Sequence, residues 1–227
     1  MKLSIIIPVY NEAKTIKAIV EKVLKIPHEK EVIIVDDCST DSTDEVLRKI
    51  NHSVIIKLKM NKNSGKGAAL MKGFENATGD IVLIQDADLE YDPEDYEPMI
   101  ELINKDLADV VYGSRFLGGR IRRSHNLSNY YGNKIFTFIN NLLYNATLTD
   151  MNTCYKIIKR AEFKKLNIKS QGFNFEAEFT AKVCKRNLRI YEVPIAYHGR
   201  NVKEGKKLKF YHGFQHLWTL LKYRFTD

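Results

Sequence analysis

Apolar residues along the chain follow two spacings, and these spacings predict its secondary structure. Compact apolar runs predict five β-strands, at Leu3–Val9, 31–36, 53–60, 80–85 and 109–112. Between them, apolar residues recur three and four positions apart, as on the buried face of a helix. The first such stripe begins near Glu12 and comprises Ile16, Ile19, Val20, Val23 and Leu24. Because strands and helices alternate, the pattern predicts an α/β fold with a mainly parallel central sheet flanked by helices.

Polar and glycine-rich segments mark where the next helices begin. Segment 39–44 is rich in Ser, Thr and Asp, which cap helix N-termini, and segment 64–67 opens a third helix. After Gly113 the pattern changes to a basic loop at 118–123, helices at 130–144 and 175–183, a strand at 188–197 and an amphipathic helical segment at 210–225. We interpret residues 1–227 as one domain, since no repeat or low-complexity linker divides them.

Charge divides the chain into two halves near Gly113. Residues 1–112 contain 14 Lys and Arg against 21 Asp and Glu, a net charge of −7, whereas residues 113–227 contain 22 against 7, a net charge of +15. An acidic half suits metal binding, and a basic half suits phosphate groups, anionic lipid or nucleic acid.

Other bulk features exclude several classes of protein. The three cysteines are widely separated and lack CxxC spacing, so neither a disulfide framework nor a zinc site is supported. No apolar run approaches the ~20 residues of a membrane-spanning helix, and the first residues lead into a strand rather than a signal peptide. We therefore expect a cytoplasmic protein.

Two carboxylates directly follow the fourth predicted strand. In an extended segment Asp86 and Asp88 project to the same side, at the sheet edge where α/β folds bind ligands. Their oxygens can share a hard cation such as Mg²⁺ or Mn²⁺, which can neutralise the diphosphate of a nucleotide. The alternative is that both acids only solvate a turn, which is the commoner role of an isolated Asp-x-Asp. The surrounding motifs favour the metal site.

Further loops are expected at the same edge. Loop 8–12 leaves the first strand and can hold a base and ribose, and Asp36 and Asp37 leave the second strand, where a carboxylate can accept hydrogen bonds from a base or ribose hydroxyl. Gly65-Lys66-Gly67 resembles a phosphate cradle, because glycine permits close approach and helix N-termini attract anions. The chain lacks the Walker pattern and GxGxxG, which argues against P-loop and dinucleotide folds.

Five motifs occur in a characteristic order: IIIPVYNE at 5–12, VDDCSTDST at 35–43, NSGKGAA at 63–69, QDADLEYDP at 85–93 and GSRF at 113–116. On these motifs the chain resembles family 2 glycosyltransferases, and among them the dolichol-phosphate mannose synthase-like enzymes that glycosylate a polyprenyl phosphate. The resemblance implies a GT-A, Rossmann-like fold. Residues 1–112 would then bind a nucleotide sugar, and residues 113–227 the acceptor.

The resemblance also implies roles for particular residues. The implied nucleotide-binding residues are Pro8, Tyr10, Glu12, Asp37, Lys66 and Asp86. The implied ligands of Mg²⁺ or Mn²⁺ are Asp86, Asp88 and Glu90. The candidate catalytic residues are Asp88, Arg115, Glu178 and Arg200, and the candidates for holding the acceptor phosphate are Arg115, Arg123, His125, Arg200 and Lys206.

A phosphate acceptor places particular demands on such a site. It needs no strong general base, because a second pKa of about 6 leaves a phosphate monoester largely dianionic at neutral pH. It does need cations that overcome repulsion from the donor diphosphate, a task suited to the forked guanidinium of Arg115 and Arg200. For Glu178 and Asp150, serving as base for a hydroxyl acceptor or bracing the acceptor loop both stay open, and bracing is favoured for Asp150.

Several alternatives stay open for the substrates. GDP-mannose is the first expectation for the donor, with UDP-glucose or UDP-N-acetylglucosamine next, and inversion at the sugar is implied by the resemblance. A family 2 transferase acting on a sugar hydroxyl is the alternative enzyme. A basic membrane- or nucleic-acid-binding module is the non-enzymatic alternative, although it leaves the acidic cluster without a purpose. Because the chain has no nucleic-acid-binding motif, we expect no nucleic-acid partner.

Segment 210–225 allows two interpretations. Its apolar residues at helical spacing are Phe214, Leu217, Trp218, Leu221 and Phe225, flanked by lysines and an arginine. Such a stripe can pack in the core or lie on a membrane surface near a lipid acceptor. On the second interpretation the protein associates peripherally with the cytoplasmic face of a membrane, directly or through a membrane-anchoring partner.

Overall fold

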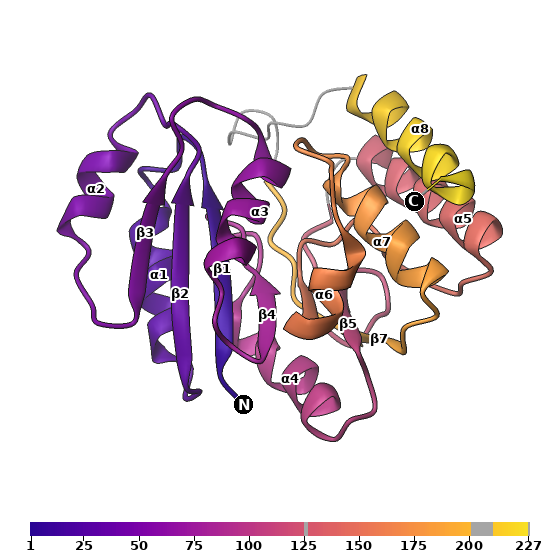
Figure 1. Cartoon of the computed structure of the whole chain (residues 1–227), viewed down its shortest axis with the longest axis horizontal. Helices are drawn as coiled ribbons and strands as arrows, with labels where there is room; N and C mark the ends of the chain where they lie inside the picture. Colours follow the sequence, from indigo (N-terminus) through magenta and orange to yellow (C-terminus); the bar gives the residue numbers. More distant parts are fainter. Residues whose placement is uncertain (125–126, 201–210, 227) are drawn as a thin grey trace.

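The computed structural model describes residues 1–124, 127–200 and 211–226. Within these residues, seven strands form one sheet in the order β3-β2-β1-β4-β6-β5-β7 (Figure 1). Their bounds are β1 Leu3–Val9, β2 Lys30–Asp36, β3 Ile55–Lys59, β4 Ile81–Ile84, β5 Val110–Ser114, β6 Lys156–Lys159 and β7 Ile190–Pro194. All pairings are parallel except those of β6, which runs antiparallel to β4 and β5. The predicted α/β fold with a mainly parallel sheet is confirmed.

Helices flank the sheet and connect its strands (Figure 1). Their bounds are α1 Ile16–Lys25, α2 Thr43–Lys49, α3 Lys66–Asn76, α4 Tyr96–Asn104, α5 Leu127–Tyr144, α6 Arg160–Leu166, α7 Phe175–Lys185 and α8 Tyr211–Phe225. A short 3-10 helix, Pro93–Asp95, precedes α4. The parallel pairs β1–β2 and β2–β3 are each joined through a helix, as parallel connections require.

The observed secondary structure differs from the prediction at three helices and one strand. Helix α1 begins at Ile16 rather than near Glu12, because the backbone N–H groups of Thr15 and Ile16 both donate to the Glu12 carbonyl and form a turn there. Strand β6 and helices α4 and α6 were not predicted. Strand β6 is only four residues long and has a lysine at each end, so it lacks the apolar run by which the other strands were found.

The strand register brings three loops to one edge of the sheet. Strands β1 and β2 pair in parallel from Leu3 opposite Lys30 to Val9 opposite Asp36, so both end together. The Asp37 N–H donates to the Val9 carbonyl at 2.8 Å. Strand β4 pairs with the other side of β1, and the Gln85 N–H donates to the Ile6 carbonyl at 2.9 Å. The segment that carries Asp86 and Asp88 therefore begins beside the last residues of β1 and leads toward the loop that follows this strand.

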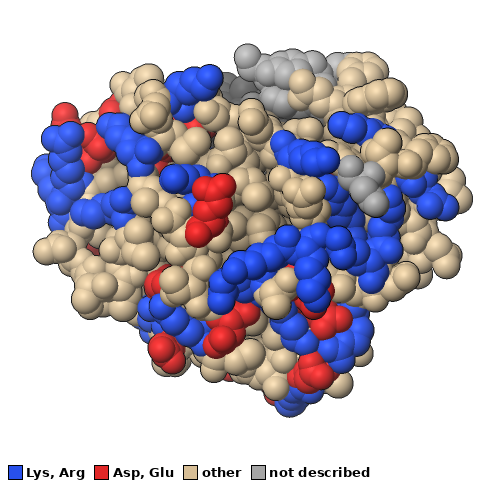
Figure 2. All heavy atoms as spheres, viewed as in Figure 1, with Lys and Arg blue, Asp and Glu red and all other residues tan. Residues whose placement is uncertain are grey.

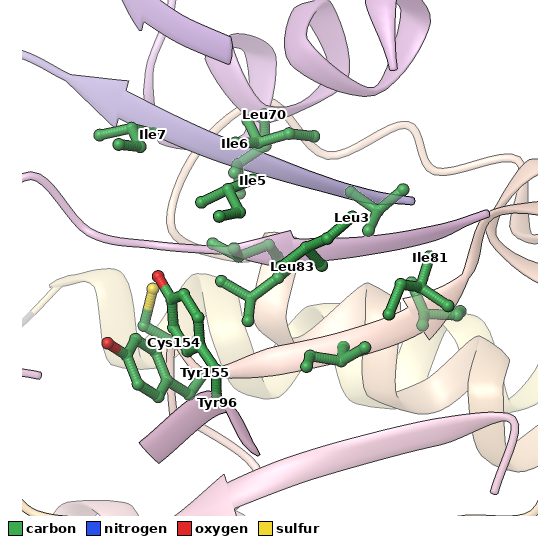
Figure 3. Packing of buried hydrophobic residues seen from close by; sticks show 14 of the residues in the cluster. Leu3, Ile5, Ile6, Ile7, Leu70, Ile81, Leu83, Tyr96, Cys154 and Tyr155 are labelled. Carbon is green, nitrogen blue, oxygen red and sulfur yellow. The ribbon is translucent and has the colours of Figure 1, made fainter. Parts of the chain in front are cut away.

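The main core includes the apolar residues of β1 and β4 (Figure 3). The Tyr96 and Tyr155 rings lie next to each other, and both hydroxyls donate to the Gln85 side-chain oxygen, at 2.5 and 2.6 Å. The Gln85 amide nitrogen in turn donates to the Asp86 carbonyl at 2.9 Å. Because buried polar groups need partners, this network fixes the backbone at the start of the acidic segment.

A second, smaller core lies between α5, α7 and α8. Its buried members are Leu148, Met151, Ala177, Ala181, Leu220 and Tyr223. Helices α5 and α8 lie side by side at the right-hand edge of Figure 1, next to α7. Residues 113–227 therefore carry an additional helical layer beyond the sheet.

Candidate functional site

A cleft of about 1120 Å³ lies at the carboxyl edge of β1, β2 and β4. One end is lined by Pro8, Tyr10 and Asp37, and the middle by the segment that follows β4. The other end is lined by the N-terminal parts of α5 and α8. Pockets for drug-sized ligands measure about 300–1,000 Å³, so this cleft has room for two substrates lying end to end.

The carboxylate of Asp37 organises the first end of the cleft. Its two oxygens accept the backbone N–H groups of Ser64 and Gly65, each at 2.8 Å. Gly65 has φ +95°, and a Cβ there would lie 2.8 Å from the Gln171 carbonyl oxygen, so only glycine fits. Asp37 thus positions the glycine-rich loop that precedes α3 while lining the cleft itself.

Arg200 joins the acidic residues in the middle of the cleft. Its guanidinium contacts the Asp88 carboxylate at 2.6 Å and both oxygens of Glu12 at 3.2 Å. Its backbone N–H donates to Glu90 at 2.7 Å, and the other Glu90 oxygen accepts the Tyr197 hydroxyl at 2.9 Å. The structure therefore brings four of the sequence-predicted site residues, Glu12, Asp88, Glu90 and Arg200, into one cluster.

The acidic residues repel one another, which shows in the pKa of Asp88. Burial, followed by the neighbouring carboxylates of Asp86 and Glu90, raises this pKa to about 7, although Arg200 acts in the opposite direction. Repulsion of this kind favours binding of a cation between the carboxylates.

Two residues of the site offer oxygen ligands that suit a divalent cation. Asp86 and Asp88 offer carboxylate oxygens, the ligands that Mg²⁺ and Mn²⁺ prefer. Glu90, the third predicted ligand, uses both oxygens for Tyr197 and the Arg200 backbone. The Asp88 oxygens accept the Glu90 backbone N–H and the Arg200 guanidinium, so a cation at Asp88 would have to displace that guanidinium. Within residues 1–124, 127–200 and 211–226, no three His, Cys, Asp or Glu side chains are arranged as a ready metal site. A cation held by Asp86 and Asp88 would need its remaining ligands from the substrate or from water.

Lys66 links Asp86 to a second set of charges. Its ammonium contacts Asp86 at 2.7 Å and Glu176 at 3.7 Å, and the other Glu176 oxygen pairs with the buried Lys156. Burial lowers the pKa of Lys66, but Asp86 and Glu176 outweigh burial and raise it well above the ordinary value. Lys66 is therefore a permanent cation beside the predicted metal site.

Arg115 lies at the cleft but is held by Asp150. Its guanidinium donates two hydrogen bonds to the Asp150 carboxylate, both at 2.7 Å, and its backbone N–H donates a third at 3.1 Å. The Asp150 side chain is fully buried and that of Arg115 is 9% exposed. The guanidinium also lies 5.1 Å from the centre of the Tyr197 ring. Asp150 therefore has the geometry of a brace, which fixes the end of β5.

Glu178 is not brought to the cleft. It is fully buried, and its carboxylate accepts the backbone N–H groups of Lys169 and Ser170 and pairs with Lys182 at 2.7 Å. Burial raises its pKa, but these contacts outweigh burial and lower it. Glu176, two residues earlier on α7, lines the cleft instead. Residues two apart on a helix point about 200° apart, so only one of these acids can face the cleft.

The remaining predicted residues lie at the margin of the site or outside the described residues. Arg123 is exposed, and its guanidinium donates to the Gly199 carbonyl at 3.2 Å. His125 and Lys206 lie outside the residues that the structure describes.

Three residues that line the cleft were not predicted as site residues, because none of the five sequence motifs contains them. Asn152, Glu176 and His216 each carry a buried polar side-chain atom for which the described structure provides no hydrogen-bond partner. Burial, with a smaller effect of Lys156, lowers the pKa of His216 to about 4, so its ring is neutral near pH 7. Such atoms suit hydroxyl groups, which can both donate and accept hydrogen bonds.

A sheet whose strand ends carry a large cleft and paired aspartates defines an α/β domain of the kind that binds nucleotides at its carboxyl edge. Comparison with known proteins then identifies the family. The chain belongs to the family described as "Glycosyl transferase family 2", which matches residues 4–166.

Two curated relatives are similar in sequence. The "Low-salt glycan biosynthesis hexosyltransferase Agl6" of Haloferax volcanii is 28% identical over 96% of this chain and 53% of its own length. The "Dolichol-phosphate mannosyltransferase" of Pyrococcus furiosus is 34% identical over 53% of this chain and 35% of its own length. The chain thus spans about half or less of these relatives.

A solved structure shows the same fold. Glucosyl-3-phosphoglycerate synthase from Mycobacterium tuberculosis, in a complex with Mn²⁺, UDP and glucosyl-3-phosphoglycerate, aligns with a TM-score of 0.75 over 98% of this chain and 79% of its own. The two sequences are 18% identical. The fold is therefore GT-A-like, as the resemblance implied.

Proposed function

We propose that this chain transfers a hexose from a nucleotide sugar to a polyprenyl phosphate, with inversion at the anomeric carbon. One observation carries the proposal. A single cleft is lined by Pro8, Tyr10 and Asp37, by the Asp86–Asp88 pair and by residues of α5 and α8, two helices that also expose apolar side chains. The names of the relatives support a hexosyl donor and a lipid-phosphate acceptor.

The donor would lie along the first two thirds of the cleft. Pro8, Tyr10 and Glu12 would line the base and ribose, with the loop held by Asp37 beside them. Asp86 and Asp88 would hold Mg²⁺ or Mn²⁺, which when bound would neutralise the donor diphosphate. The structural relative from Mycobacterium tuberculosis binds Mn²⁺ and UDP in one complex, which supports this arrangement.

In the reaction itself, an acceptor phosphate oxygen would attack the anomeric carbon while the bond from that carbon to the diphosphate breaks. The diphosphate leaves with the electron pair, and a dianionic acceptor has no proton to lose. Lys66 and Arg200 are the cations placed to balance the negative charge that gathers there. Because Arg200 now contacts Asp88, its guanidinium would have to exchange carboxylate for phosphate contacts as the cation and donor bind.

The finer substrate assignment follows the relatives. GDP-mannose is the first donor to test because one relative is a mannosyltransferase, and UDP-glucose or UDP-N-acetylglucosamine comes next because a structural relative binds UDP. No described helix is long and apolar enough to cross a membrane. We propose that a lipid acceptor is reached by peripheral association with the cytoplasmic face of a membrane, or through an anchoring partner.

A hydroxyl acceptor is the second candidate, because Glu176 places a carboxylate in the cleft. Its contacts with Lys66 and Lys156 argue against a role as general base, because both of its oxygens already face cations rather than an acceptor hydroxyl. A polyprenyl phosphate, which needs no base, fits this environment better.

The direct test is transfer from radiolabelled GDP-mannose, UDP-glucose and UDP-N-acetylglucosamine to a short-chain polyprenyl phosphate, with Mn²⁺ and without it. We expect one donor to give a lipid-linked product only when the metal is present, and the matching nucleoside diphosphate to raise the melting temperature. Transfer to a glycan hydroxyl, with none to the lipid phosphate, would contradict the proposed acceptor.

A further inference from the structure

The outer side of α5 carries a stripe of large apolar side chains in contact with water. Its members, spaced four, four, three and four residues apart, are Leu127, Tyr131, Ile135, Phe138 and Leu142. Their exposed fractions range from 55% to 74%. An amphipathic helix normally turns such a stripe toward the core, but α5 buries its other side and leaves this one outside.

Helix α8 continues the same surface. Trp218, Leu221 and Phe225 are 68%, 38% and 84% exposed. The two helices are joined by the Tyr144 hydroxyl, which donates to the Leu220 carbonyl at 2.6 Å, and by the Phe136 and His216 rings, whose centres lie 5.0 Å apart. The exposed stripes of α5 and α8 together form what we call the α5–α8 apolar face. Exposed apolar patches of this kind mark sites of membrane or protein contact.

The charge around this face identifies what it contacts. Neither helix contains an Asp or Glu, whereas Lys134, Lys222 and Arg224 lie on them. Figure 2, drawn from the same side as Figure 1, shows Lys, Arg and uncharged residues over these helices. Apolar side chains beside basic ones suit an anionic bilayer. Two copies of this face would instead bring like charges together, which disfavours self-association.

The face also borders the cleft. Gly132 and Ile135 of α5 and Gly213 and Leu217 of α8 line the cleft that contains Asp86 and Asp88. Ile135 belongs to both surfaces. A lipid in a bilayer beneath the face could therefore place its headgroup in the cleft while its chain stays among the apolar side chains.

We propose that the protein docks on anionic membranes through the α5–α8 apolar face, with α5 as the main contact element and the cleft opening directed at the bilayer. The use of this opening by a lipid acceptor rests on the proposed function, whereas the docking itself does not. From the sequence, segment 210–225 allowed either core packing or membrane contact, and we assign the larger share of the membrane contact to α5.

The test measures co-sedimentation of the intact protein with vesicles of phosphatidylcholine, with and without phosphatidylglycerol, in the absence of donor and acceptor. We expect binding to the anionic vesicles only, and reversal by salt. A Phe138→Ser, Leu142→Ser double variant should weaken binding by at least ~10-fold, since both side chains lose their burial in lipid. The control is an Ile56→Ser, Leu107→Ser variant, which removes partly exposed apolar side chains away from this face and should bind unchanged.

Trp218 gives an independent signal, because it is the only tryptophan in the chain. Exposed in the free protein, it should emit at long wavelength and shift to shorter wavelength with anionic vesicles. Emission that is already blue without lipid, or a dimer that dissociates in the α5 variant, would mean that protein covers the face and would overturn the proposal. Equal vesicle binding by the α5 variant and the control would overturn it as well.

Two further measurements separate docking from folding and from catalysis. Circular dichroism should show the wild-type fold for both variants, and their melting temperatures should stay above the assay temperature, because none of the replaced side chains is fully buried. Transfer to a short-chain, water-soluble polyprenyl phosphate should be kept by the α5 variant. A wild-type protein that binds vesicles but transfers no sugar would refute the proposed function and leave the docking surface standing.

Discussion

The two halves of the molecule, residues 1–112 and residues 113–227, differ in how far their apolar residues are buried. In the acidic half, Ile5, Ile6 and Ile7 are three consecutive residues of β1 and all are fully buried, because helices and neighbouring strands enclose them on both sides. In the basic half, Phe138 and Leu142 of α5 are 67% and 74% exposed. Hydrophobic composition alone does not decide burial. The acidic half encloses these apolar residues, whereas the basic half leaves part of its apolar surface exposed to water.

The halves also differ in charge, and they meet in the cleft. The acidic half supplies Glu12, Asp88 and Glu90, and Arg200 of the basic half pairs with all three. These contacts join residues more than a hundred positions apart, so they connect the two halves directly. Substitutions in each half can test how activity and stability depend on its residues.

The largest effect is expected at the acidic side of this junction. Asp88→Asn should lower transfer by ~10³-fold or more, equivalent to about 4 kcal/mol, because it removes a charged ligand of the proposed cation. A steady-state transfer assay measures the loss, and Glu94→Gln, at an exposed carboxylate, serves as the control. Undiminished turnover, or activity that survives a chelator, would rule out the metal at this position.

An effect of comparable size, on stability rather than chemistry, is expected in the basic half. Arg115→Ala leaves the buried Asp150 carboxylate without its partner, which should cost about 3–5 kcal/mol of unfolding free energy. Urea unfolding measures this cost, and an Arg115→Met, Asp150→Leu double variant should recover part of it. If Arg115→Ala keeps its stability but shows a raised KM for the acceptor, Arg115 holds phosphate, as the family resemblance implied.

The smallest effect, a change in unfolding free energy, is expected far from the cleft, at Glu31 in the acidic half. Burial raises the pKa of Glu31, but hydrogen bonds from Lys2, Ser4 and Thr78 outweigh burial and lower it from 4.5 to about 2. Because the pKa is depressed in the folded state, the stabilisation is complete above the unfolded value and is lost as pH falls toward 2.

Glu31→Gln should therefore reduce unfolding free energy by about 2–3 kcal/mol near neutral pH and by almost nothing near the folded pKa. Urea unfolding across the acid range tests this, with exposed Glu29→Gln as the control. A difference that does not change with pH would show that the charge of Glu31 is unimportant.

Much of the structure of residues 1–112 could be predicted, because the sequence patterns that indicate it involve neighbouring residues. Strand β1 has the bounds that its apolar run predicts, and Asp37, Asp86 and Asp88 follow the two strands that pair in parallel with β1. Strand β6 could not be predicted. Lys156 lies at its start and is fully buried, where it pairs with Glu176 of α7, twenty positions away. A buried lysine violates the pattern of strand residues, and only its distant partner makes it possible.

The sequence by itself determined the alternation of strands and helices, the motifs at the strand ends and the opposite charges of the two halves, since each depends on neighbouring residues. The tertiary structure decided which residue of a pair faces the cleft and which side of a helix meets water. Glu176 rather than Glu178 lines the cleft because the packing of α7 sets its rotation. The α5 stripe is exposed because α7 and α8 pack against the other side of that helix, and no local pattern contains that choice.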